Sequence, residues 1–417
     1  MAEDILQILP GVAKVRVDQD LTGIGKLMGQ WFEYPEIYNA EQKEGKKIVV
    51  VWPLNPTEPY FAADVNPYDI LGHEATYHGQ LEEDFGEREG GKAIKAGEEA
   101  GLSVDSCRFN CCWYGAFMTD STLVKPDAFS MFVGPWCDNV AKSWQLASTK
   151  KELPLHAVDT PVYHPDKEDW AIDYMVKELE DLMEWLARIS GRETTEQDLK
   201  EQIKIHNECR KMQQEITKFL SLSKVPINAL DHHLSLAINA DWFGSPEKAL
   251  DALKTLYDEG NERAKKGIMA PNISEDNPRI FWIGMPTTDY LKTFSLIEDL
   301  GGTYVGQDVY WTNCYDLMDE RKEPLEAIAE WTWKMPYNIP TEYRMEATLP
   351  LIKESNPDGA IYCCNFGCHN WGSPALMIRD VLKEELGIPT LILDATVPAE
   401  HGPEFREKIG SFIDMLK

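Results

Sequence analysis

Cysteine is the residue type whose number and spacing in this sequence indicate chemistry. Cys137 and Cys368 each follow a predicted strand and precede a helical pattern, and Cys107 lies in a third loop. In open parallel sheets, ligands gather beyond the carboxyl ends of the strands, where the chain turns into the next helix. Helix N-termini at such places present unpaired N–H groups and positive partial charge, which stabilise thiolates and an anionic cluster. We therefore predict an oxygen-sensitive iron–sulfur centre bound by these three residues.

Five further cysteines lie in or near the same loops, namely Cys111, Cys112, Cys314, Cys363 and Cys364. Cys209 lies apart, inside a helical pattern. Nine cysteines in 417 residues are too few for a disulfide scaffold, so they are available as metal ligands. Single cysteines are often buried only for packing, but the concentration of eight of the nine in four loops favours ligation. Structural zinc is the competing metal, although the spacings Cys107/Cys111 and Cys364/Cys368 match a zinc knuckle only weakly.

The elements that must position these cysteines are those of an α/β fold. Short apolar runs alternate with helical patterns towards both ends of the chain, which is typical of parallel sheets built from βαβ units. In the middle, helices follow one another without a strand between them. We therefore predict two doubly wound, Rossmann-like parallel-sheet domains, at residues 1–165 and 271–417, joined by a helical segment at residues 166–270. The predicted strands are Ile48–Trp52, Ala128–Val133, Leu155–Val158, Arg279–Met285, Thr303–Val305, Ala360–Cys364 and Thr390–Leu393.

The composition restricts the classes of partner. A formal net charge of −29 disfavours non-specific association with nucleic acid or with an anionic membrane. No stretch approaches the roughly 18 uninterrupted apolar residues that a membrane span needs. The first residues, Met1 to Asp4, contain neither the basic nor the apolar region of an export signal, so we expect a cytoplasmic protein.

From about Lys46 to Leu416 the chain resembles the 2-hydroxyacyl-CoA dehydratase and benzoyl-CoA reductase superfamily. The segments that carry the resemblance are Ser103–Cys107, Pro126–Asn139, Asp358–Cys368 and Gly387–Asp394. The resemblance implies that Cys107, Cys137 and Cys368 bind a [4Fe-4S] cubane with one iron open to a substrate or water. It also implies a separate ATP-hydrolysing iron–sulfur activator that supplies low-potential electrons, since this chain has no G-x-x-x-x-G-K-[ST] loop. Members of the superfamily pair two homologous subunits or two copies of one chain.

The surplus cysteines resemble one branch of that superfamily, the double-cubane cluster proteins. In this branch two cubanes share a bridging sulfide, and six cysteines of one chain hold the resulting [8Fe-9S] cluster. The resemblance implies that the three ligands above are joined by Cys111 or Cys112, by Cys314, and by Cys363 or Cys364. Such a self-sufficient set favours a homodimer.

His73 and Glu74 are the candidate catalytic residues. Dehydratase subunits carry a Pro-Glu-Asn type motif where this chain has Leu71–Ala75, so Glu74 is retained and His73 replaces the proline. With His78 they share a predicted loop that the resemblance places near the cluster, where a carboxylate or imidazole could deliver protons. A solvent-exposed polar loop is the alternative. His369, next to Cys368, could hydrogen-bond a cluster sulfide and tune its potential.

Several other polar and aromatic residues have simpler interpretations. The pair His232-His233 and the acidic run Glu82-Glu83-Asp84 are expected at the surface. Three tryptophans close to candidate ligands would exclude water from the cluster or simply pack the core: Trp113, Trp136 and Trp371.

Taken together, these features predict a low-potential iron–sulfur reductase that acts on a small molecule. Because the serine that dehydratases place near the thioester carbonyl is replaced around Trp52-Pro53-Leu54, chemistry on a 2-hydroxyacyl-CoA or an aryl-CoA is the second prediction. A third class, an electron-transfer or zinc-stabilised scaffold subunit, stays open. Iron content separates these alternatives.

Overall fold

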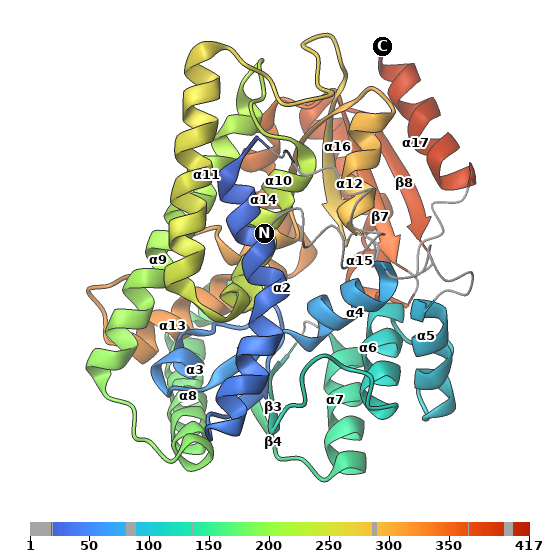
Figure 1. Cartoon of the computed structure of the whole chain (residues 1–417). Coiled ribbons are helices and arrows are strands. Elements are labelled where there is room, and N and C mark those ends of the chain that lie inside the picture. The colour runs from blue at the N-terminus through green and yellow to red at the C-terminus, as the bar shows by residue number, and fades with distance from the viewer. Residues whose placement is uncertain are drawn as a thin grey trace.

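The computed structural model describes residues 18, 20–80, 89–134, 137–285, 290–365, 367–395 and 403–417. It contains two parallel sheets of four strands each, surrounded by helices (Figure 1). The orders are β2-β1-β3-β4 and β6-β5-β7-β8, so both sheets repeat one doubly wound pattern. The predicted α/β class with two parallel-sheet units is confirmed. The strands are β1 (Ile48–Val50), β2 (Asn66–Tyr68), β3 (Ala128–Val133), β4 (Leu155–Asp159), β5 (Arg279–Gly284), β6 (Thr303–Gln307), β7 (Gly359–Asn365) and β8 (Thr390–Ala395).

One strand, β2, was not predicted from the sequence. It consists of Asn66, Pro67 and Tyr68 and pairs in parallel with β1. Asparagine and proline are depleted in strands, so the segment gives no strand signal. Proline is tolerated here because β2 lies at the edge of its sheet.

The helices of the N-terminal unit cover its sheet and lead into the first two cysteine loops. The close approach of α5 and α6 depends on Gly115, where a Cβ would lie 1.7 Å from the carbonyl oxygen of Ala93. His73 and Glu74 lie on helix α4, not on the predicted loop. The helices are α2 (Thr22–Lys43), α3 (Glu58–Ala62), α4 (Ile70–Gln80), α5 (Glu89–Glu99), α6 (Arg108–Met118) and α7 (Asp138–Lys151).

The middle of the chain forms a layer of helices without strands. Helix α9 begins with a capping box in which Thr195 and Asp198 exchange hydrogen bonds. Helix α2 packs against the same layer, since a Cβ at Gly23 would lie 2.4 Å from the backbone nitrogen of Leu256. The helices are α8 (Glu168–Ser190), α9 (Glu196–Lys218), α10 (Ala229–Ala237) and α11 (Pro246–Lys266), with 3₁₀ turns η3 (Pro165–Lys167), η4 (Phe219–Ser221), η5 (Ile238–Ala240) and η6 (Trp242–Gly244).

Two expectations about surface residues are affected by the fold. His232 and His233 are fully buried on α10, so the prediction of a surface pair was wrong. Both ring nitrogens of His232 contact buried hydroxyl groups, those of Thr217 and Tyr304, and Nδ1 of His233 contacts the amide of Gln307. The acidic run at 82–84 and Trp136 lie outside the described residues.

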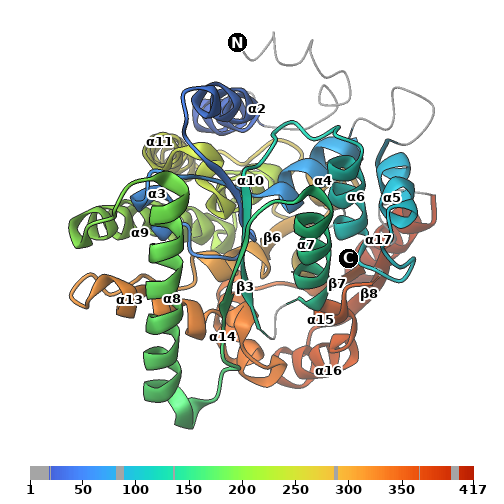
Figure 2. The ribbon, with the colours of Figure 1, turned by 90° about the horizontal axis from the view of Figure 1, so that it is seen from below.

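The C-terminal unit brings the third cysteine loop against the N-terminal unit. Short helix α15 lies beside α6 and α7, at the junction of the two sheets (Figures 1 and 2). None of the helices in the described ranges is long and apolar enough to cross a membrane. The remaining elements are η7 (Tyr310–Asn313), η8 (Pro336–Asn338) and the helices α12 (Tyr290–Asp299), α13 (Pro324–Lys334), α14 (Thr341–Ser355), α15 (His369–Gly372), α16 (Ala375–Leu386) and α17 (Pro403–Leu416).

Candidate metal-cluster site

Each of the three cysteines predicted as primary ligands is the N-cap residue of a helix. Cys107 precedes α6, Cys137 precedes α7 and Cys368 precedes α15. Cys137 comes after β3 and Cys368 after β7, and each of these strands is the inner neighbour of the first strand of its sheet. The two residues therefore occupy equivalent positions in the two sheets, at the point where the strand order reverses.

The three cysteine loops are in direct contact. Gly367 has a φ of +74°, and a Cβ there would lie 2.6 Å from the carbonyl carbon of Ser106 and 2.7 Å from the backbone nitrogen of Cys107. The side-chain amide of Asn139 donates to the carbonyl oxygen of Gly367 at 3.1 Å. Because only glycine combines that φ with that proximity, the sequence at this position fixes how closely the two sheet units approach.

Burial and mutual proximity dominate the electrostatics of the thiols. Burial raises the pKa of Cys137 to about 12, and the charge of Cys107 contributes to that rise. The pKa of Cys368 is raised well above its usual value by burial and then by the charges of Cys107 and Cys137. Burial likewise raises the pKa of Cys107. The three sulfurs thus lie close enough to repel one another as thiolates, and they need a positive partner to ionise.

Backbone N–H groups supply part of that positive potential. The N–H groups two and three residues after each cysteine lower its pKa: those of Phe109 and Asn110, of Asn139 and Val140, and of Asn370 and Trp371. None of the three side chains forms a capping hydrogen bond. The sulfurs are therefore faced by the helix N-termini while keeping their lone pairs available to a metal.

The thiols are not gathered around a single point. In the described part of the chain, no group of three His, Cys, Asp or Glu side chains is arranged to hold a metal ion. A tetrahedral zinc site would require such an arrangement. The irons of a cubane occupy separate corners, so its thiolates lie further apart than the ligands of one ion. Thiolates at three helix N-termini are soft, anionic ligands of the kind that bind iron–sulfur clusters.

Of the remaining predicted cysteine ligands, some lie beside the three primary ligands and others do not. Cys111 lies one turn after Cys107 in α6, and its sulfur is 3.9 Å from the carbonyl oxygen of Ser106. Burial raises the pKa of Cys111 to about 11, and the charge of Cys107 contributes to that rise. Cys364 lies near the end of β7, with its sulfur 3.7 Å from the carbonyl oxygen of Trp371. Both positions border the site.

Cys314 lies elsewhere. It follows η7 and is fully buried, and its carbonyl oxygen accepts a hydrogen bond from Gln214 on α9. Burial raises the pKa of its thiol, and the guanidinium of Arg210 is the charged group that acts on it. The alternates Cys112 and Cys363 are buried within α6 and β7. The complete set of six ligands stays a prediction.

His73 and Glu74 are buried rather than exposed. One Glu74 carboxylate oxygen accepts hydrogen bonds from the hydroxyl group of Tyr68 at 2.5 Å and from the backbone N–H of Leu123 at 2.8 Å. Burial lowers the pKa of His73 to about 4, so the ring is neutral at physiological pH. Neither side chain is joined by a hydrogen bond or ion pair to a described residue of the cysteine loops. A catalytic role for them stays a prediction.

Comparison with known proteins identifies the family. A family model described as "2-hydroxyglutaryl-CoA dehydratase, D-component" matches residues 55–416. The chain belongs to this family. It is 24% identical to the (R)-phenyllactyl-CoA dehydratase alpha subunit of Clostridium sporogenes over 279 residues, 66% of each chain. It is 22% identical to lactoyl-CoA dehydratase subunit alpha of Anaerotignum propionicum over 293 residues, 67% of each chain. With a benzoyl-CoA reductase subunit of Thauera aromatica the identity is 23% over 304 residues, 67% of this chain and 72% of that one.

These matches span about two thirds of the length of the first two relatives. The relatives are subunits of dehydratases and of a reductase, so this chain is a member of a family of enzymes. The predicted superfamily is confirmed.

Three residues beside the cysteines were not singled out from the sequence of this dehydratase-family protein. Burial raises the pKa of Tyr337, and the charges of Cys368 and Cys137 raise it further, so its hydroxyl group lies near both thiols. The guanidinium carbon of Arg344 lies 4.2 Å from the centre of the Trp371 ring. The hydroxyl group of Tyr362 donates to the carbonyl oxygen of Trp371 at 2.7 Å. Tyrosine and arginine far away in sequence give no local signal that they will border a cysteine loop.

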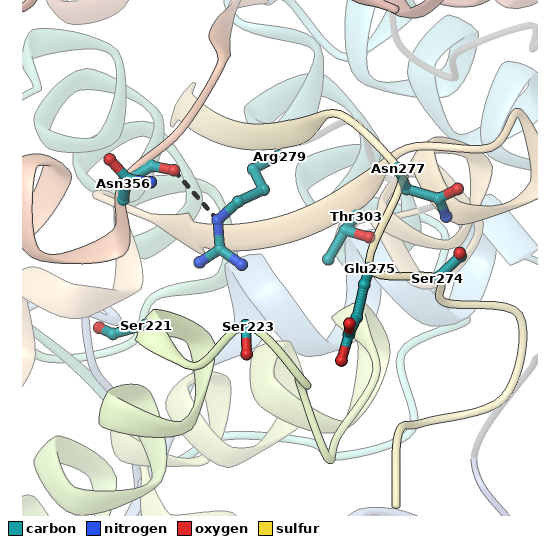
Figure 3. Close-up of a pocket in the computed structure, with 8 residues that line it drawn as sticks. All are labelled: Ser221, Ser223, Ser274, Glu275, Asn277, Arg279, Thr303 and Asn356. Atoms are coloured by element: carbon teal, nitrogen blue, oxygen red, sulfur yellow. Dashed lines mark hydrogen bonds between the residues drawn. The ribbon is translucent and has the colours of Figure 1, made fainter. Parts of the chain in front are cut away.

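A polar surface pocket lies at the end of the second sheet that is opposite to Cys368 (Figure 3). Arg279 and Thr303 are the first residues of β5 and β6, so the pocket borders the amino ends of the strands rather than their carboxyl ends. Within the described residues the Arg279 side chain donates only to backbone carbonyl oxygens, including that of Asn356 at 3.0 Å (Figure 3). It therefore ties together chain segments, and we assign the pocket no chemistry. Its lining residues are Ser221, Ser223, Ser274, Glu275, Asn277, Arg279, Thr303 and Asn356.

Proposed function

We propose that this chain is the cluster-bearing subunit of an enzyme that carries out one-electron chemistry at a [4Fe-4S] cluster held by Cys107, Cys137 and Cys368. The observation that carries the proposal is the meeting of three N-cap cysteines from two sheet units in one partly buried junction. When bound, such a cluster supplies single electrons and an iron with an open position. The chain contributes the thiolates, the helix N-termini that stabilise them and the burial that keeps water away.

The electrons would come from a separate ATP-hydrolysing iron–sulfur activator in the cytoplasm. All three relatives are named as subunits, two of them as alpha subunits, which supports pairing with a homologous subunit or a second copy. In this arrangement ATP is hydrolysed by the activator and not by this chain.

We propose a CoA thioester as the substrate, either a 2-hydroxyacyl-CoA that loses water or an aryl-CoA that is reduced. The relatives' names include both kinds of substrate. Glu74 and His73 are the proposed proton carriers. The hydrogen bond between Tyr68 and Glu74 extends a buried polar chain along α4, and His78 lies 3.5 Å from the second oxygen of Glu74.

A second candidate is the reduction of a small molecule at an [8Fe-9S] double cubane. The positions of Cys111 beside Cys107 and of Cys364 beside Trp371 favour it, because they surround the primary ligands with further thiols. The position of Cys314 next to Arg210 disfavours it. An iron content of about four per chain indicates the single cubane and about eight the double one.

The decisive experiment measures iron, acid-labile sulfide and zinc in the anaerobically purified protein and in Cys137→Ala and Cys368→Ala. We expect iron and sulfide in the natural protein and loss of the cluster absorption and EPR spectra in both variants. Cys209→Ala is the control, because Cys209 is a fully buried cysteine away from the three loops, on α9, where its sulfur contacts the carbonyl oxygen of Pro246. Zinc without iron or sulfide would refute the proposal, and it would support the scaffold class instead.

A further inference from the structure

Arg344 is a buried cation to which the described residues offer no acceptor at two of its guanidinium nitrogens. The residue lies on α14 and is 2% exposed. Its Nε and Nη2 atoms have no hydrogen-bond partner, and no carboxylate of the described residues forms an ion pair with it. The indole nitrogen of Trp371, the ring under the guanidinium, is also buried without a partner. The two Arg344 nitrogens and the Trp371 indole nitrogen are all hydrogen-bond donors, so this part of the structure lacks an acceptor. A buried charge without a partner is strongly destabilising.

Asp308, an acid on whose pKa the charge of Arg344 acts, does not meet this need. Asp308 directly follows β6 and is buried, and burial raises its pKa to about 6 although the charge of Arg344 acts to lower it. One of its oxygens accepts a hydrogen bond from the backbone N–H of Gly284 at 2.9 Å. It makes no ion pair or hydrogen bond with the guanidinium. The acceptor that Arg344 lacks is therefore not a described side chain of this protein.

The unpaired donors lie on the buried side of the cysteine site. Trp371 follows Cys368 by three residues, and its backbone N–H faces the sulfur of Cys368. The hydroxyl groups of Tyr337 and Tyr362 feel the charges of both Cys368 and Arg344. The Arg344–Trp371 stack therefore lies next to the loop of Cys368, one of the three ligand loops.

We propose that Arg344 is the buried counter-charge of the cluster. The inference rests on the proposed function and goes beyond it, since it assigns a positioning and tuning role to a residue outside the ligand loops. A cluster with three thiolate ligands is an anion rich in sulfide acceptors, which matches three unpaired donors and one positive charge. Because a nearby cation stabilises the more negative, reduced cluster, Arg344 raises the reduction potential above that of a cluster with a neutral neighbour. Stacking on Trp371 holds the guanidinium in place.

The test compares Arg344→Met, Arg344→Gln and Arg344→Lys with the natural protein, all reconstituted anaerobically with iron and sulfide. Midpoint potentials are measured by titration with Ti(III) citrate, followed by EPR. We expect full iron content and a lowered potential in the Met and Gln variants, with Lys close to the natural value. The Met variant without cluster should unfold at the same or a higher temperature than the natural protein without cluster, because it no longer buries an unpaired charge.

Arg279→Gln is the matched control, since Arg279 is a partly buried arginine of the same sheet unit but at its other edge, with carbonyl partners. It should lose stability and keep the potential. A natural potential in a fully loaded Met or Gln variant would overturn the counter-charge and leave the ligand assignment intact. The same result with weakened binding of an anionic substrate would reassign Arg344 to that substrate. A natural protein that takes up no iron would overturn both proposals.

Discussion

The two sheets of this protein share one strand order, and yet the buried acids at equivalent places have opposite neighbours. Asp69 directly follows β2 and Asp308 directly follows β6, each at the edge of its sheet. Burial and the facing carboxylate of Asp241 together raise the pKa of Asp69 well above the usual value. Burial also raises the pKa of Asp308, but the facing guanidinium of Arg344 acts to lower it. Asp69 thus faces a second carboxyl group, which favours its protonated form, whereas Asp308 faces a positively charged side chain.

This difference suggests that the two halves contribute different groups to the junction where the three cysteine loops meet. The N-terminal half supplies two cysteine loops and a buried carboxyl, imidazole and phenol cluster that can hold protons. A small cavity between that half and the middle helical layer is lined by Asp69, His73 and Asp241, and also by Phe243, whose φ of +42° is strained for a side-chain-bearing residue. The C-terminal half supplies the third cysteine and the counter-charge. The same fold therefore carries complementary electrostatics on the two sides of one site.

The largest expected effect comes from breaking the contact between the halves at Gly367. In Gly367→Ala the new Cβ meets the backbone of Ser106 and Cys107 and the φ of +74° is unfavourable. We expect the free energy of unfolding to fall by several kcal/mol, more than the ~1–2 kcal/mol of a left-handed residue alone, and the cluster to be lost. Urea unfolding and iron analysis measure the two effects.

Gly387→Ala separates conformation from contact in that experiment. Gly387 has a φ of +71°, but a Cβ there meets nothing within 4 Å. This variant should lose only about 1 kcal/mol and keep its cluster. Equal losses in the two variants would show that the approach of the loops is not what Gly367 provides.

The next effect is a pH dependence of stability that arises from the buried acid pair Asp69 and Asp241. Burial raises the pKa of Asp241 to about 6, from an ordinary value of 3.8. The folded state therefore binds this proton more tightly than the unfolded chain, and the stabilisation is lost as the pH rises through about 6. We expect Asp241→Asn to lack this loss, which amounts to at most about 3 kcal/mol, in urea unfolding between about pH 4 and pH 7.

Tyr34→Phe is the control for that window. The Tyr34 hydroxyl group donates to Asp241 at 3.1 Å and lowers its pKa, so removing it should move the loss of stability to higher pH without abolishing it. If Asp241→Asn and the natural protein lost stability in parallel, the acid pair would not be the proton store of this half.

The sequence predicted the scaffold and the cysteine loops because both depend on local patterns. The buried strand Ala128–Val133 is a continuous apolar run, and Cys137 follows it closely. Short, polar β2 gave no such pattern. The burial of His73 and Glu74 was missed because a polar helix face looks exposed until the hydroxyl group of Tyr68 is known to meet it.

The sequence also did not predict the contacts between segments that lie far apart in the chain. No local pattern connects Arg344 on α14 to Trp371 on α15, or places Cys314 next to Arg210. The sequence placed Cys314 among the additional ligands because it follows a predicted strand. Only the topology separates a cysteine at the switch point of a sheet, such as Cys368, from one packed against a distant helix.

The smallest effect concerns an exposed contact between the loops of Cys368 and Cys137. His369, predicted to tune the cluster, instead points to Asp138, with 3.5 Å between Nδ1 and the nearer carboxylate oxygen, and its side chain is 73% exposed. Because exposed ion pairs contribute little, we expect His369→Ala to change the free energy of unfolding by less than about 0.5 kcal/mol and to leave the potential unchanged. Asn139→Ala, which removes the partly buried hydrogen bond to Gly367, should cost about 1 kcal/mol. A larger effect of His369 than of Asn139 would mean that the exposed rim, and not the buried loops, holds the two halves together.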